Sequence, residues 1–164
     1  MPKLIINQPM KHLLLLPFML LLYCSSSHGQ NVIRISNCKD ELITKQVDSI
    51  KSAFTRQGFI VAKEASITME SEYEMAVMVA LTEGSWYQFV FIGDIGSKLY
   101  EVRMFDSDEK QVVYQKKMWG DVDGNVINFS YIPKFSEYYA FRPVQVNKKK
   151  KELCGYVMLL KKVK

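Results

Sequence analysis

The chain has 164 residues, enough for one domain of ordinary size, and its 22 basic and 17 acidic side chains give a formal net charge of +5. Its two histidines, His12 and His28, both lie near the N-terminus. Beyond residue 28 the chain lacks imidazole, which excludes Ser-His-Asp and Cys-His nucleophile systems and histidine-ligated zinc or iron sites. We therefore expect no cofactor and rank an enzyme below a non-catalytic protein.

Residues 1–29 have the parts of a secretory signal peptide. A short basic opening precedes Leu13–Tyr23, "LLLLPFMLLLY", an apolar run of 11 residues. The run is too short for a bilayer span, which needs about 20 residues, but it suits a signal-peptide core. Small residues at Ser27 and Gly29 predict cleavage before Gln30. We therefore expect the mature protein in the periplasm or outside the cell.

Cys24 offers an alternative to cleavage before Gln30. The stretch "LLYCSSS" resembles a bacterial lipoprotein signal, in which the cysteine is acylated and a serine-rich tether follows. Tyr23 departs from that pattern, because the signal peptidase takes a small residue at this position. We favour simple export. Attachment to a membrane, as an outer-membrane lipoprotein, is expected only if Cys24 is lipidated.

Residues 38–57 predict the one helix of the mature chain. Its apolar side chains recur at intervals of four, three and four residues and form one stripe: Ile43, Val47, Ile50 and Phe54. Ser36 or Asn37 is the expected N-cap, and Gly58 is expected to end the helix.

After the helix the apolar period changes to two. Residues 59–69 hold one or two short strands, and further strands lie within about 73–163, with a turn signal about every 8–12 residues. This spacing predicts a mainly β fold, a two-sheet sandwich with the helix at its N-terminal end, over residues 30–164. Residues 75–81 and 156–160 are apolar on both faces and are expected to form central strands.

A resemblance to a known family covers roughly half of the mature chain. The stretch "LTEGSWYQFVFIGDIGSKLYEVRMFDSDEKQVVYQKK" resembles the core of the bacterial pre-peptidase C-terminal domain, and "GYVMLLKKV" is similar to its closing strand. The resemblance implies a jelly-roll-like sandwich and a non-catalytic accessory role in secreted proteins. The N-terminal helix departs from the family, and so do residues 147–152, where the family has a polar, glycine-bearing segment. No ligand site is carried over.

The stretch "GDVDGN" alternates oxygen-bearing side chains, at Asp121, Asp123 and Asn125, as calcium-binding loops do. A calcium loop needs glycine at its sixth position and an acid at its twelfth, whereas Gly124 stands fourth and Ile132 twelfth. Asp-Gly between two alternating segments is a strong signal for a hairpin turn. We interpret the stretch as a hairpin, with a metal site as the alternative.

Aromatic side chains are numerous and are the first candidates for ligand contacts. Trp119, Tyr138 and Tyr139 are expected to be exposed, where they could stack on a sugar ring or on a partner chain. The alternative for each is packing between the two sheets.

Four consecutive lysines form a basic run: Lys148, Lys149, Lys150 and Lys151. We interpret the run as the solvated tip of a hairpin, which also discourages pairing of strand edges. The alternative is a site for an anionic glycan or for phospholipid headgroups. Outside this run the charges are mixed, which argues against nucleic acid as a partner.

Cys38 and Cys154 are the two cysteines left after removal of the signal peptide. An even count in an exported chain favours a disulfide, and the termini of compact domains often lie close together. The alternative is a pair of buried thiols that pack as small apolar groups.

Together these patterns predict an exported, non-catalytic binding or accessory module of the bacterial cell envelope, with a glycan or an envelope protein as its ligand. The alternative is a structural subunit of an envelope or secretion assembly that has no small ligand.

Overall fold

The computed structural model describes residues 38–122 and 124–163. The predicted signal peptide and Cys24 lie outside these residues. The described residues form one helix, α2 (Glu41–Arg56), and eight strands. The strands are β1 (Phe59–Glu70), β2 (Val77–Leu81), β3 (Tyr87–Gly93), β4 (Leu99–Phe105), β5 (Gln111–Met118), β6 (Val126–Tyr131), β7 (Glu137–Val146) and β8 (Glu152–Lys162). In this part of the chain no helix has the length and apolar character needed to cross a membrane.

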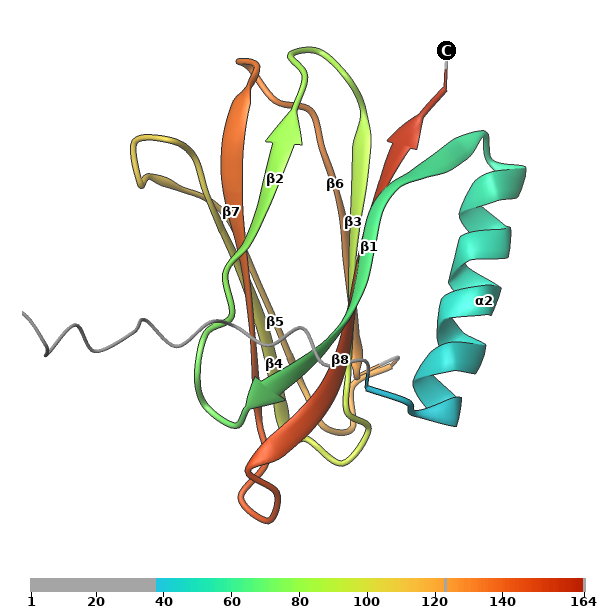
Figure 1. Cartoon of the computed structure of the whole chain (residues 1–164), viewed down its shortest axis with the longest axis vertical. Coiled ribbons are helices and arrows are strands. Elements are labelled where there is room, and N and C mark those ends of the chain that lie inside the picture. The colour runs from blue at the N-terminus through green and yellow to red at the C-terminus, as the bar shows by residue number, and fades with distance from the viewer. Residues whose placement is uncertain (1–37, 123, 164) are drawn as a thin grey trace, which may run out of the picture. The chain divides into compact units, whose positions relative to one another are not determined.

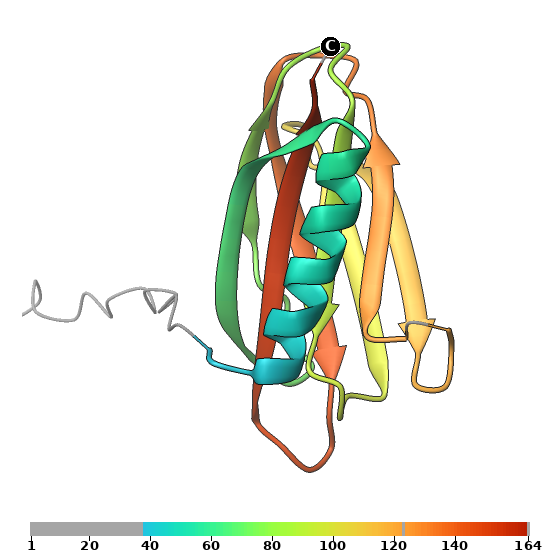
Figure 2. The ribbon, with the colours of Figure 1, turned by 90° about the vertical axis from the view of Figure 1, so that its right-hand side faces the viewer.

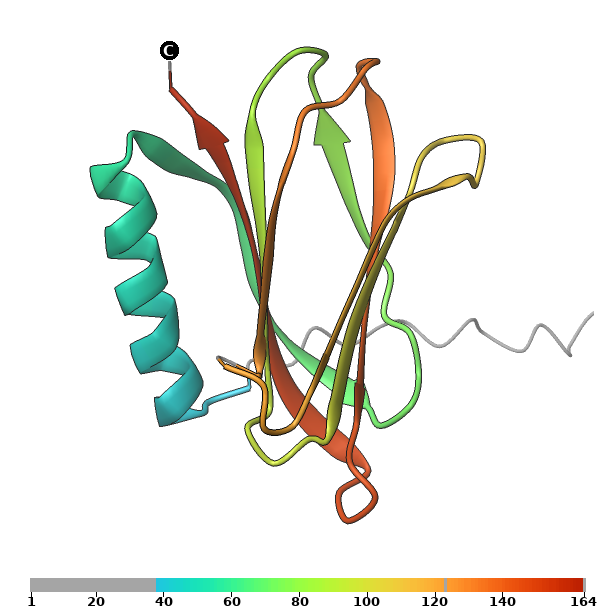
Figure 3. The same cartoon turned by 180° about the vertical axis from the view of Figure 1, so that it is seen from behind.

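The strands form two four-stranded antiparallel sheets (Figures 1 and 3). The helix-covered sheet has the order β1-β8-β3-β6, and the open sheet has the order β2-β7-β4-β5. The pairs are nested in the sequence, because β1 pairs with β8, β2 with β7, β3 with β6 and β4 with β5. Such nesting is a long hairpin rolled into two sheets, which is a jelly roll. The predicted fold class is confirmed.

The main core fills the space between the two sheets. Three phenylalanines from both sheets stack there: the ring of Phe89 lies 5.1 Å from that of Phe129 and 5.4 Å from that of Phe141. Alternate residues of every strand reach this core because successive side chains point to opposite faces of a sheet.

Helix α2 lies on the outer face of the helix-covered sheet and runs along its strands (Figure 2). Ile43 and Val47 of its predicted stripe are buried against the sheet, and Ile50 and Phe54 are partly buried there. This second core explains why every residue of β3 is buried: one face meets the open sheet and the other meets the helix.

The helix begins later than predicted, and the expected cap at Ser36 or Asn37 is wrong. Asp40 is the N-cap, and its Oδ1 accepts hydrogen bonds from the backbone N–H groups of Leu42 (2.9 Å) and Ile43 (3.1 Å). The segment before the cap is held on β1, where Ser66 Oγ donates to Cys38 O and accepts from Cys38 N. The predicted end is correct: Gly58 follows the helix with φ +79°.

Two strands differ from the prediction. β1 is one strand of 12 residues, and a bulge between Val61 and Lys63 interrupts its alternation, so the sequence resembles two shorter strands. β2 is an edge strand that pairs with β7 alone, so its predicted central place is wrong. Met78 is 49% exposed there. β8 does occupy a central place, as predicted.

A disulfide joins Cys38 to Cys154, with the two Cα atoms 5.5 Å apart. Cys154 lies in β8 opposite Thr68 of β1. The bridge therefore fixes the N-terminal end of α2 to the helix-covered sheet.

Candidate functional site

The Asp-Gly stretch connects two different sheets, so the predicted hairpin is wrong. β5 belongs to the open sheet and β6 to the helix-covered sheet, and each pairs with another strand. The turn closes locally instead, since Met118 N donates to Asp121 Oδ2 at 2.7 Å and Asp121 N donates to Met118 O at 3.1 Å. Gly120 allows this turn with φ +99°. Asp123 lies outside the described residues.

The remaining candidate metal ligands have partners within the protein. Asp121 Oδ2 accepts from Met118 N within its own turn. Asn125 Oδ1 accepts a hydrogen bond from Gln46 Nε2 at 3.1 Å. Asn125 Nδ2 donates to Gln46 Oε1 at 2.8 Å and to Gly93 O at 3.2 Å. Among residues 38–122 and 124–163, no three His, Cys, Asp or Glu side chains gather closely enough to hold a metal ion.

A shallow, open depression of about 200 Å³ lies beside this turn, and we call it the Trp119 depression. Its lining consists of Ile95, Tyr100, Trp119, Gly120, Asp121, Gly124 and Asn125. Trp119 is 72% exposed, and its backbone N–H donates to Lys98 O at 2.9 Å. An exposed indole therefore stands beside the exposed carboxylate of Asp121, a combination that suits a ligand with one apolar face and polar edges.

Tyr100 forms a rigid, buried part of this lining. Its single hydroxyl proton is shared between two carbonyl oxygens, Asp94 O at 2.7 Å and Ser97 O at 2.9 Å. Burial, helped by the negative charge of Asp94, raises the pKa of Tyr100 to about 12. The hydroxyl therefore stays protonated and keeps donating at neutral pH. Gly93 leaves room for the ring, because a Cβ there would lie 2.7 Å from it.

The lysine run also connects two sheets, so its predicted place at a hairpin tip is wrong: β7 and β8 pair with other strands. Asn147 Oδ1 orders the loop by accepting from Lys149 N (2.9 Å) and Lys150 N (3.3 Å). The ammonium of Lys150 lies 3.1 Å from Oδ2 of the buried Asp94. The side chains of Lys148, Lys149 and Lys151 are exposed.

Trp119 and the lysine loop lie at the same end of the sandwich. Lys98 connects them, since its backbone O accepts from Trp119 N and its backbone N donates to Val146 O at 2.8 Å. Val146 is the last residue of β7, directly before the lysine loop.

The two candidate tyrosines point in opposite directions. Tyr138 is 65% exposed on the outer face of the open sheet, near the start of β7 and so far along the strand from the lysine loop. Tyr139 is 1% exposed, and its ring lies 5.5 Å from that of Tyr131. The expected exposure of Tyr139 is wrong, because neighbouring residues on a strand face opposite sides. Burial and a hydrogen bond with Tyr131 raise the pKa of Tyr139.

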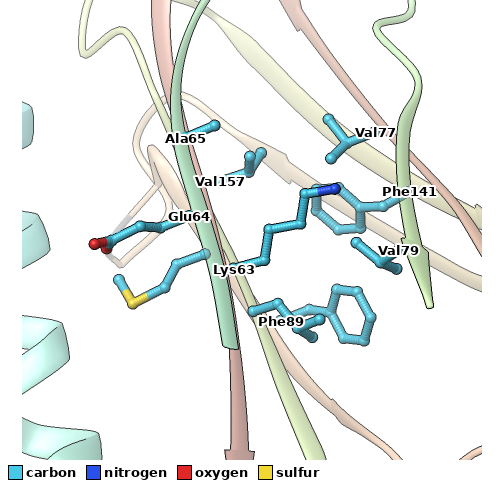
Figure 4. A pocket seen from close by; sticks show the side chains of 10 residues that line it. Lys63, Glu64, Ala65, Val77, Val79, Phe89, Phe141 and Val157 are labelled. Atoms are coloured by element: carbon cyan, nitrogen blue, oxygen red, sulfur yellow. The ribbon is translucent and has the colours of Figure 1, made fainter. Parts of the chain in front are cut away.

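A second hollow, an apolar slit, opens between the edge strands β1 and β2 (Figure 4). Its volume is about 20 Å³, enough for about one water molecule and too small for a ligand. Lys63 reaches across the slit, and its Nζ donates to Met78 O at 2.8 Å. The lysine thus protects two strand edges from pairing with another chain.

No family model matches the chain, and no curated protein matches it. Among solved structures, the chain is similar to one described as "Bacillus endospore appendages form a novel family of disulfide-linked pili", at 8% identity over 64% of this chain and 88% of that chain (TM-score 0.40). The chain is also similar to one described under "CBM4 structure and function", at 13% identity over 64% of this chain and 79% of that chain (TM-score 0.41). The adhesin domain of Lys-gingipain from Porphyromonas gingivalis is similar at 12% identity over 60% of this chain and 72% of that chain (TM-score 0.40). Likeness at this level assigns no ligand, partner or activity to the chain.

Three residues of the site were not among the predicted ones. Ile95 and Tyr100 line the depression from the β3–β4 loop and from β4, and Gln46 holds Asn125 from α2. The two glycines of "GDIGSK" mark the loop that carries Ile95. Nothing in the sequence indicates Gln46, which lies 79 residues from its partner.

Proposed function

We propose that the protein is an exported, non-catalytic binding module of the bacterial cell envelope and that it binds a glycan at the Trp119 depression. The signal-peptide pattern of residues 1–29 supports export. The resemblance of residues 81–117 to the pre-peptidase C-terminal domain supports an accessory role. A disulfide between Cys38 and Cys154 suits an oxidising compartment.

The observation that carries this proposal is the 72% exposure of Trp119 at a depression with polar lining. A sugar ring has an apolar C–H face, which can stack on indole, and hydroxyl groups at its edge, which can bond to the Asp121 carboxylate. The depression of about 200 Å³ is smaller than the 300–1,000 Å³ that is usual for drug-sized ligands. This size favours recognition of one sugar unit over enclosure of a long chain.

A glycan array with the purified mature protein, followed by titration of the best-bound glycan, tests the proposal. We expect Trp119→Ala to weaken binding by about tenfold or more, equivalent to about 1.4 kcal/mol. Phe135→Ala is the matched control, because Phe135 is an aromatic residue 67% exposed in the β6–β7 loop. Absence of any bound glycan would refute the proposal, and so would equal affinities of Trp119→Ala and the unaltered protein.

The second candidate is a structural subunit of an envelope or secretion assembly. The outer face of the open sheet favours it, since no helix in the described part of the chain covers this face. Met78, Tyr114 and Tyr138 are 49%, 47% and 65% exposed there, and aromatic residues and methionine are enriched in protein interfaces. Co-purification of an envelope complex that persists in Trp119→Ala and is lost in Tyr138→Ala would favour this candidate over glycan binding.

A further inference from the structure

Helix α2 is connected directly to the lining of the Trp119 depression. Gln46 and Asn125 pair through both atoms of each amide, at 3.1 and 2.8 Å. Asn125 is 7% exposed and is also held by β3, because Gly93 N donates to Asn125 O at 2.8 Å. The backbone of Asn125 is therefore held by the sheet, and its side chain is held by the helix.

The position of Gln46 depends in turn on how α2 is anchored. Ile43 and Val47, which flank Gln46 on the helix, are buried against the sheet at 6% and 5% exposure. The disulfide at Cys38 lies two residues before the cap Asp40 and fixes this end of the helix covalently. The other end of α2 continues through Gly58 into β1.

We propose that Gln46 is a positioning residue for the Trp119 depression, and that the Cys38–Cys154 disulfide controls the order of this depression by holding α2 in place. The connection runs from the disulfide through the first two turns of α2 to the Gln46–Asn125 pair and the turn that carries Trp119. Its importance for ligand binding rests on the proposed function, whereas the structural connection does not.

Reduction of the disulfide by a dithiol reductant is the step that would release the helix. The S–S bond breaks, two electrons and two protons convert Cys38 and Cys154 to thiols, and the dithiol is oxidised to a cyclic disulfide. The first turns of α2 then lose their covalent anchor and open more often. Each opening separates Gln46 from Asn125 and leaves the Trp119 turn supported by the sheet alone.

Hydrogen exchange of the backbone amides of Trp119 and Asp121, which donate to Lys98 O and Met118 O, measures this connection without any ligand. We expect dithiothreitol to accelerate their exchange by about tenfold, and Gln46→Leu to do the same in the oxidised protein. Lys45→Ala is the matched control, because Lys45 is exposed on the same turn of the helix, and it should leave the exchange unchanged. The amides of β4 report unfolding of the whole domain. They should exchange faster in dithiothreitol, because loss of the bridge lowers global stability, and should stay unchanged in oxidised Gln46→Leu.

A second readout uses Trp119 itself. The chain has two tryptophans, so Trp86→Phe leaves Trp119 as the single tryptophan, and its emission can be excited selectively over that of the tyrosines. Acrylamide quenching of this variant should change on reduction and on addition of Gln46→Leu, but not on addition of Lys45→Ala.

Unchanged exchange at Trp119 and Asp121 after both reduction and Gln46→Leu would overturn the proposal. Equal acceleration of Trp119, Asp121 and β4 by Gln46→Leu in the oxidised protein would overturn it as well, because that result indicates unfolding of the whole domain with the bridge intact. Neither readout needs a ligand, so a failure to bind glycan would refute the proposed function but would not contradict this inference.

Discussion

Gln145 has no exposed surface, and it joins three segments near the base of the candidate site. Its Oε1 accepts from Asp94 N at 2.8 Å and from Ser97 Oγ at 3.3 Å, and its Nε2 donates to Cys154 O at 2.9 Å. Through these bonds, one side chain of the open sheet holds the loop that follows β3 and a strand of the helix-covered sheet. The amide therefore orders the end of the sandwich that carries the Trp119 depression.

We expect Gln145→Leu to destabilise the protein strongly. Leucine has a similar volume but leaves the buried N–H of Asp94 and the carbonyl of Cys154 without these partners. Each buried polar group that loses its partner costs about 1–3 kcal/mol. Urea denaturation measures the loss, with the exposed Gln115→Leu on β5 as the control. A Gln145→Leu variant within about 0.5 kcal/mol of the unaltered protein would contradict this role.

At the scale of elements, a polar triad fastens the middle of α2 to the sheet. Lys51 Nζ lies 2.7 Å from Glu64 Oε2, and the Tyr156 hydroxyl donates to the same oxygen at 2.6 Å. Burial tends to raise the pKa of Glu64, but hydrogen bonds from Lys51 and Tyr156 and the charge of Lys51 outweigh it and lower the pKa. Burial and the bond to Glu64 raise the pKa of Tyr156. The triad therefore favours ionised Glu64 beside a neutral tyrosine.

A pH dependence of stability follows from the lowered pKa of Glu64. The stabilisation is present above the pKa of the unfolded chain and is lost as the pH falls through the lower folded value. We expect Glu64→Gln to be less stable than the unaltered protein at pH 7, with the difference shrinking below the ordinary glutamate value of 4.5. Urea denaturation at pH 7 and pH 3 measures it. Glu83→Gln, an exposed change in the β2–β3 loop, is the control. A difference that is the same at both pH values would contradict the role of the triad.

At the scale of the whole molecule, the disulfide closes a loop that contains nearly the entire described chain. Cys38 and Cys154 are 116 residues apart, and every strand except the remainder of β8 lies between them. The bridge restricts the unfolded chain far more than the folded one, in which β1 and β8 are already paired. Stabilisation of this kind grows with the length of the loop.

We expect the double substitution Cys38→Ser with Cys154→Ser to lower the free energy of unfolding by up to about 5 kcal/mol. Chemical denaturation measures the effect on three samples: the oxidised unaltered protein, the variant, and the unaltered protein reduced by dithiothreitol. The last two should agree, because both lack the bridge. A variant as stable as the oxidised protein would show that the bridge contributes no stability.

The local pattern of the sequence determined the type and approximate place of most elements. The stripe of Ile43, Val47, Ile50 and Phe54 predicted α2, and Gly58 predicted its end, because a helix buried on one face requires apolar residues at its own period. The change to a period of two predicted the strands for the same reason. Part of the candidate site could also be found in this way, because Trp119, Asp121 and Asn125 lie in one short segment.

Tertiary structure alone decided which strands pair and which side chains meet. In a jelly roll, β1 pairs with β8 and β3 with β6, so strands that follow one another, such as β5 and β6, need not form a hairpin. Such pairings between distant segments bury Tyr139 in the core and place Gln46 in contact with Asn125. The period of the apolar residues shows which side chains of a segment share one buried face. It contains no information on which other segment covers that face. The partner depends on the closure of the whole sandwich, which distant parts of the chain determine together.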